Sequence, residues 1–71
     1  MKAEQIQKLV KRLSPEEIDN LKRLQVCKAQ EALEIKGGAS VLKALEVDGL
    51  IHRRGSLVEL THRGKLVARH L

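Results

Sequence analysis

The feature that most constrains this chain is a change of hydrophobic period after Asp48-Gly49. Before this dipeptide, apolar residues recur at the three- and four-residue intervals of amphipathic helices. After it, two short segments with apolar residues, 50–54 and 57–60, flank Gly55-Ser56. A glycine in the first position of a two-residue loop suits a type II′ hairpin turn. We therefore predict a β-hairpin with four opposed pairs: Arg54 with Leu57, Arg53 with Val58, His52 with Glu59, and Ile51 with Leu60.

The segment before this hairpin predicts four helices. Residues 3–13 form an amphipathic stripe, and Ser14-Pro15-Glu16-Glu17 combines a capping serine, a first-turn proline and the glutamate of a capping box. The second helix is expected to break near Gln25–Lys28. If it continued to residue 35, its apolar residues would point in all directions. A short third helix then runs to about Ile35, and Gly37-Gly38 separates it from a fourth helix over 38–48.

Thr61 is positioned to cap a last helix after the hairpin. The predicted fold is therefore mainly α with a C-terminal β-hairpin, in the order α-α-α-α-β-β-α. Seventy-one residues fit one domain, 1–71, in which 1–13 is an N-terminal helix and 14–71 form the core. The single cysteine, Cys27, is expected to be a small buried hydrophobic residue.

Composition restricts the classes of partner. The chain has no Phe, Trp or Tyr, whereas modules that grip unpaired bases usually stack them on aromatic rings. The net charge of +5 is concentrated at the C-terminal end, since residues 49–71 hold five Lys or Arg and a single Glu. There is no apolar run long enough to span a membrane and no signal-peptide core at the N-terminus, so a cytoplasmic protein without membrane contact is expected.

Two motifs around the hairpin resemble those of winged-helix proteins. The segment 45–51 (Leu-Glu-Val-Asp-Gly-Leu-Ile) resembles the "LExxGLI" link from recognition helix to wing, and 60–64 (Leu-Thr-His-Arg-Gly) resembles the "LTxxG" segment that closes the wing. Both occur in regulators of the multiple-antibiotic-resistance type and in the winged-helix extension of archaeal-type phenylalanyl-tRNA synthetase α chains. The resemblance covers residues 38–66 and implies a winged helix-turn-helix.

What this resemblance implies is binding of double-stranded DNA by a small transcriptional regulator, with helix 38–48 in the major groove and the 50–60 wing on the backbone. The expected contacts fall into three groups. The groove-facing residues are Ser40, Lys43, Ala44 and Val47. The wing residues are His52, Arg53, Arg54 and Ser56. Lys36 and Arg63 are expected to add phosphate contacts.

DNA binding has one alternative. A winged helix used as a protein–protein or ribonucleoprotein assembly module, with a partner at Ala44 and Val47, is the alternative, because the groove-facing set is poor in the side chains that read bases. A homodimer through residues 3–13 and 62–71 is expected, as in the resembled regulators. No catalytic motif is present, so no enzyme and no cofactor are expected, and Cys27, His52 and His62 are too scattered to predict a metal site.

Overall fold

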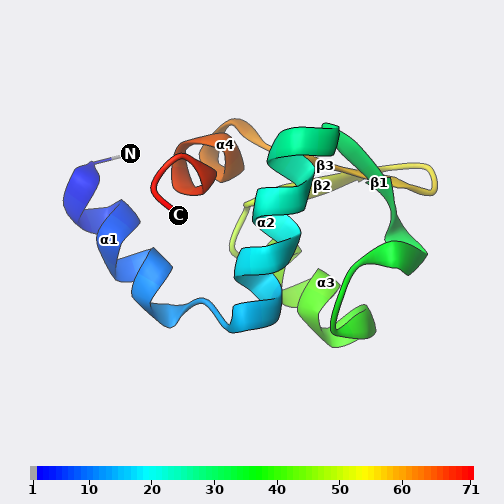
Figure 1. Cartoon of the computed structure of the whole chain (residues 1–71), viewed down its shortest axis with the longest axis horizontal. Helices are drawn as coiled ribbons and strands as arrows, with labels where there is room; N and C mark the ends of the chain where they lie inside the picture. Colours follow the sequence, from blue (N-terminus) through cyan, green and yellow to red (C-terminus); the bar gives the residue numbers. More distant parts are fainter. Residues whose placement is uncertain (1) are drawn as a thin grey trace.

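The protein has a mixed α+β fold in which helices predominate (Figure 1), as seen in a computed structural model that describes residues 2–71. The elements are α1 (Ala3–Arg12), α2 (Pro15–Cys27), β1 (Ala29–Glu31), the 3-10 helix η1 (Ala32–Glu34), α3 (Gly38–Val47), β2 (Ile51–Arg54), β3 (Leu57–Leu60) and α4 (His62–Ala68). Within residues 2–71, no helix has the length and apolar character needed to cross a membrane.

The hairpin forms as the turn chemistry predicts. Strands β2 and β3 pair in the predicted register, with Ile51 opposite Leu60 and Arg54 opposite Leu57. Gly55 takes a φ of 63° while Ser56 does not take a positive φ, which fits a type II′ turn. The register is confirmed because a two-residue loop leaves only one way for the flanking strands to align.

The predicted third helix is wrong. Lys28 ends α2 with a φ of 69°, and its amide donates to the Leu24 carbonyl at 2.8 Å. The chain then extends as β1, which pairs antiparallel with β3 and gives a three-stranded sheet in the order β1-β3-β2. Between Lys28 and Gly37, the only helical structure is the single turn η1. The order is therefore α-α-β-η-α-β-β-α, because pairing with β3 overrides the weak local preferences of Ala-Gln-Glu.

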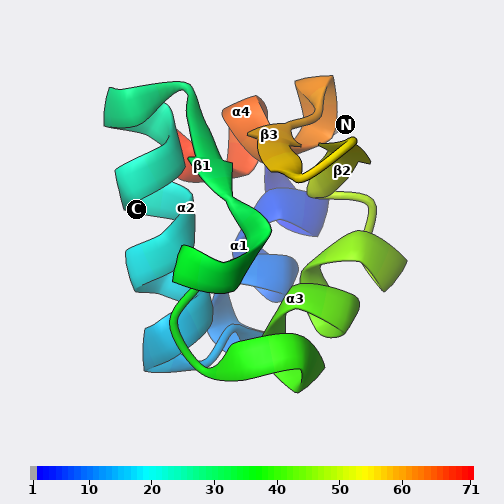
Figure 2. The same cartoon turned by 90° about the vertical axis from the view of Figure 1, so that its right-hand side faces the viewer.

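One face of the sheet is covered by helices and the other is open to solvent. Figure 2 shows β1, β3 and β2 side by side, with α2 to the left of β1 and α3 below β2. Ile51, Val58 and Leu60 are buried on the covered side, whereas His52, Arg54 and Leu57, which alternate with them along the strands, are exposed. The hairpin therefore has two chemically different faces.

The two motifs of the sequence meet at one joint between hairpin and α4. Gly49 takes a φ of 73° and turns the chain out of α3. The Thr61 hydroxyl donates to the Gly49 carbonyl and accepts from the Gly64 amide at 3.0 Å, and the Thr61 amide donates to the Leu50 carbonyl at 3.0 Å. Thr61 thus caps α4, as predicted, and ties its start to the end of α3.

The N-terminal helix packs on α4 within the same chain. Ile6, Leu9 and Leu13 are 4–8% exposed, and Val67 is fully buried. Together with residues of α2, α3 and the sheet they form one continuous core. The apolar stripes of residues 3–13 and 62–71 are therefore used inside the monomer, and the fold gives no support to the homodimer expected through them.

Candidate nucleic-acid interface

The outward face of α3 is free of packing. Leu42 and Leu45 are buried under the sheet, and one helix face of four residues remains in solvent. Its members are the predicted groove-facing residues Ser40, Lys43, Ala44 and Val47. Val47 is 73% exposed, an unusually large exposure for an aliphatic side chain. This face carries one cation, one hydroxyl and two apolar groups.

The start of α3 is held by a buried polar side chain that sequence reasoning missed. Asn20, on α2, is 1% exposed. Its Nδ2 donates to the Lys36 carbonyl and its Oδ1 accepts from the Lys36 amide, both at 2.9 Å. These bonds satisfy the backbone just before α3, where the single turn η1 provides little support of its own. No periodicity in the sequence identifies such a residue.

Arg53 connects the hairpin to α3. Its Nε lies 2.8 Å from Oε1 of Glu46, which is on α3. The Arg53 side chain is 48% exposed, so the pair lies at the surface rather than in the core. The arginine is thus beside α3, but a carboxylate already neutralises much of its charge.

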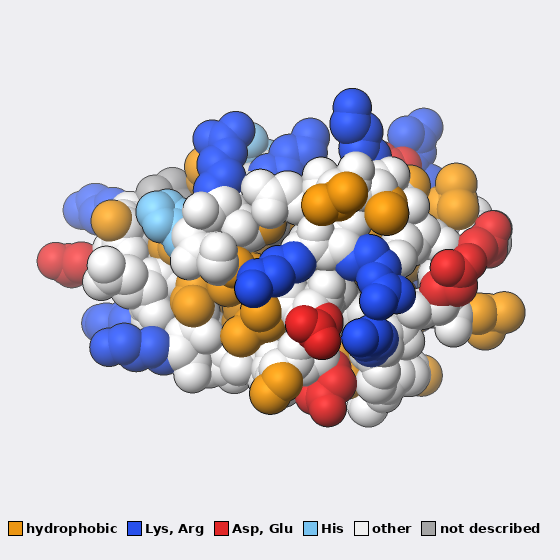
Figure 3. Space-filling model, viewed as in Figure 1, with side chains coloured by type: hydrophobic (Ala, Val, Ile, Leu, Met, Phe, Trp, Pro, Cys, Tyr) orange, Lys and Arg blue, Asp and Glu red, His pale blue; other side chains and the backbone are white. Residues whose placement is uncertain are grey.

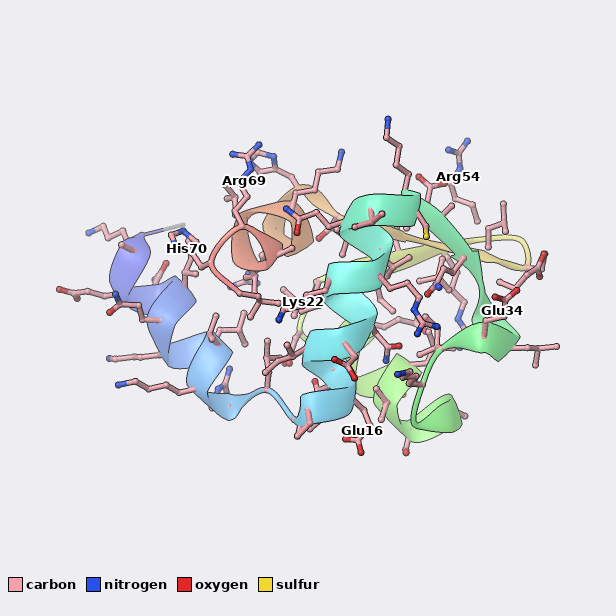
Figure 4. All side chains as sticks on the ribbon, in the orientation of Figure 1. Glu16, Lys22, Glu34, Arg54, Arg69 and His70 are labelled. Carbon is pink, nitrogen blue, oxygen red and sulfur yellow. The ribbon has the colours of Figure 1, made fainter. Side chains whose placement is uncertain are left out.

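Arg54 lies on the opposite face of the hairpin from Arg53. Its Nη1 is 3.3 Å from Oε1 of Glu59, and its side chain is 71% exposed. His52 shares this open face, and Ser56 is exposed at the turn. Figure 4 shows Arg54 at the upper margin of the molecule, away from α3. The two wing arginines therefore do not form one cluster.

The two remaining predicted contacts, Lys36 and Arg63, have different surroundings. Lys36 Nζ lies 3.6 Å from Oδ2 of Asp19, and both side chains are about half exposed. Arg63, in the first turn of α4, lines a groove of about 700 Å³ between α1 and the end of α3. Within residues 2–71 the ion pairs are the three formed by Lys36, Arg53 and Arg54, so Arg63 is in none of them.

This groove gathers cations that the sequence analysis did not select. Lys8, Lys11 and Arg12 of α1 line it beside Arg63, and Asp48 is the only acidic side chain in its lining. The expectation that the excess charge lies at the C-terminal end left out these cations, because the acidic residues elsewhere in 1–48 nearly cancel their charge. The signal was present in the spacing: basic residues at 8, 11 and 12 share one helix face.

The residues considered for a metal site are not gathered into one cluster. Within residues 2–71, no three His, Cys, Asp or Glu side chains gather in a way that could hold a metal ion. The prediction that Cys27 is buried is wrong, since it is exposed at the end of α2. Cys27 is the last residue of α2, and the side chain before it, Val26, is 81% exposed.

No protein-family model, no curated protein and no solved structure matches the chain. The fold is established at the level of a small α+β domain with a three-stranded antiparallel sheet.

Proposed function

We propose that the protein is a winged-helix domain that binds double-stranded DNA and acts in the regulation of transcription. The proposal assigns α3 to the major groove and the flanking basic surfaces to the phosphate backbone. It is supported by the direct passage from α3 through Gly49 into the hairpin, with Arg53 bonded back to α3. In this assignment, η1 stands in the position of the helix that precedes a recognition helix.

The observation that carries the proposal is the charge of the groove beside α3. Lys8, Lys11, Arg12 and Arg63 line it together, and the only opposing charge is that of Asp48. Cations gathered along one surface without acidic partners attract a polyanion, and each phosphate neutralised by them releases counterions. Since the groove opens next to Val47 at the end of α3, a duplex on the α3 face lies within reach of these side chains.

The chemistry of α3 favours modest discrimination between DNA sequences. Its exposed face lacks the Arg, Asn and Gln that form paired hydrogen bonds with base edges. Lys43 can donate to guanine, and Ala44 and Val47 can contact thymine methyl groups. Affinity is therefore expected to come mainly from phosphate contacts.

The test is a titration of duplex DNA at several salt concentrations. We expect binding whose log K falls steeply with log salt, and a shallower slope for Lys8→Gln with Arg12→Gln, by about two units for two lost phosphate contacts. The matched control removes the same charge from α2 through Lys22→Gln with Arg23→Gln, both exposed and outside the groove. Absence of binding at low salt, or equal slopes for the two double variants, contradicts the proposal.

The assembly-module alternative is supported by one observation. Ala44 and Val47 are exposed on α3, and both wing arginines are bonded to carboxylates. An apolar face beside neutralised charges suits a protein surface better than a phosphate backbone. The same titration separates the two functions, because the alternative predicts no steeply salt-dependent binding of duplex DNA.

A further inference from the structure

A second basic site lies outside the groove between α1 and the end of α3. A cleft of about 420 Å³ opens between the end of α2, strand β3 and α4. Leu24 and Leu60, both nearly buried, form part of its lining, and Lys28, Lys65 and Arg69 also line it. In Figure 3, Lys and Arg side chains gather along the upper margin, and Figure 4 shows Arg69 there, at the end of α4.

The three cations of this cleft are not neutralised by the chain. Of the ion pairs formed within residues 2–71, none includes Lys28, Lys65 or Arg69. The cleft has one carboxylate, that of Glu59, and it is already bonded to Arg54. Three free cations around a partly apolar hollow form a site for an anion that also has an organic part.

The backbone of Lys28 gives a second, independent observation. Lys28 is the only residue other than glycine that takes a positive φ within residues 2–71. A side chain at this conformation is disfavoured by roughly 1 kcal/mol, and glycine is the usual residue at such a helix end. The strain remains at a position where the side chain lines the cleft, and strained residues of this kind cluster at binding sites.

We propose that the cleft binds a small organic phosphate of nucleotide size. The phosphate is held by Lys28, Lys65 and Arg69, and the organic part lies over Leu24 and Leu60. The volume falls in the range of small-molecule sites, which is roughly 300–1,000 Å³. The site shares no residue with the groove between α1 and the end of α3. A failure of the DNA-binding proposal would therefore leave this proposal untouched, and the reverse also holds.

The cations have one alternative role, which the test must separate from ligand binding. Lys28 follows the end of α2, and Lys65 and Arg69 lie at the end of α4. Positive charge at a helix C-terminus is stabilising by itself. If that were the whole role of Lys28, its removal would lower stability and leave phosphate binding unchanged.

The first experiment is an NMR titration of the backbone amides with adenosine monophosphate, and separately with adenosine. We expect adenosine monophosphate to shift the amides around residues 24–28, 59–60 and 65–69, and adenosine at equal concentration to leave them in place. Equal shifts with both compounds, no shift with either, or shifts confined to α1 and α3 overturn the proposal.

The second experiment uses Lys28→Gly, which removes the side chain and relieves the strain of the positive φ. We expect the Tm to rise by about 4 °C, and the affinity for adenosine monophosphate to fall roughly tenfold, the loss of one hydrogen bond to a charged group. Arg69→Gln is expected to weaken binding similarly, and Arg23→Gln, exposed on α2 outside the cleft, to leave it unchanged. Unchanged affinity in Lys28→Gly, whatever its Tm, overturns the proposal.

Discussion

The side-chain amide of Asn20 forms two hydrogen bonds with the backbone of Lys36, one as donor and one as acceptor, both at 2.9 Å. An asparagine can pair with the N–H and C=O of one residue in this way because its side-chain amide offers both a donor and an acceptor. The pair joins α2 to the residue just before Gly37, which is the N-cap of α3. The orientation of the proposed recognition helix thus depends on one buried polar side chain.

Asn20→Ala is expected to lower the free energy of unfolding by about 2 kcal/mol, because the substitution removes both bonds and leaves the Lys36 backbone without partners. Chemical denaturation monitored by circular dichroism measures the loss. Gln7→Ala, an amide removed from the exposed side of α1, is the control and should change stability by less than about 0.5 kcal/mol. Equal effects of the two substitutions contradict a special role for Asn20.

Gly64→Ala is expected to be destabilising for a steric reason. A β carbon at Gly64 would lie 2.9 Å from the carbonyl carbon of Leu50 and closer still to its oxygen. Backbone atoms cannot move aside as the tip of a side chain can, so we expect a loss of about 2 kcal/mol or more. At Gly55 nothing lies within 4 Å of an added β carbon. Gly55→Asn meets no such clash and carries only the cost of the positive φ, about 1–2 kcal/mol, so it should cost less than Gly64→Ala in the same denaturation experiment.

Gln30→Met is expected to stabilise the fold. Gln30 is 9% exposed on the covered face of the sheet, opposite Val58, and its Oε1 is buried without a hydrogen-bond partner. Burying an unpaired amide oxygen is unfavourable, and methionine has a similar length without that oxygen. The free energy of unfolding should rise by about 1 kcal/mol. A clear loss of stability would show that the amide has a structural role.

The sequence was sufficient for the elements whose structure is determined locally. The Ser14 capping box, the Gly55-Ser56 turn and the Thr61 cap act within four residues of the chain, so the residue types alone identify them. The strand β1 was not predictable in this way. Ala29–Glu31 is a strand because the Leu57–Glu59 backbone lies beside it, and this pairing depends on how the whole chain closes.

In the candidate site, too, the local features were predictable from the sequence and those that depend on the folded chain were not. The exposure of Ser40, Lys43, Ala44 and Val47 followed from helical periodicity alone. The partners of Arg53 and Arg54 did not, since each arginine meets a glutamate only once the hairpin has folded. The groove of Lys8 and Arg12 with Arg63 requires α1 to lie against α4, a contact between the two ends of the chain.

The ion pair between Arg53 and Glu46 leads to the sharpest prediction about binding. Glu46 is on α3, and its carboxylate both neutralises Arg53 at 2.8 Å and repels phosphate. Glu46→Gln should therefore raise affinity for duplex DNA and steepen the salt slope by about one unit, while stability changes by less than about 1 kcal/mol because exposed ion pairs contribute little. Glu59→Gln makes the same charge change and releases Arg54, but on the hairpin face that points away from α3. If α3 and its neighbouring face of the wing contact DNA, only Glu46→Gln steepens the slope; equal gains from both variants would mean that net charge alone governs binding.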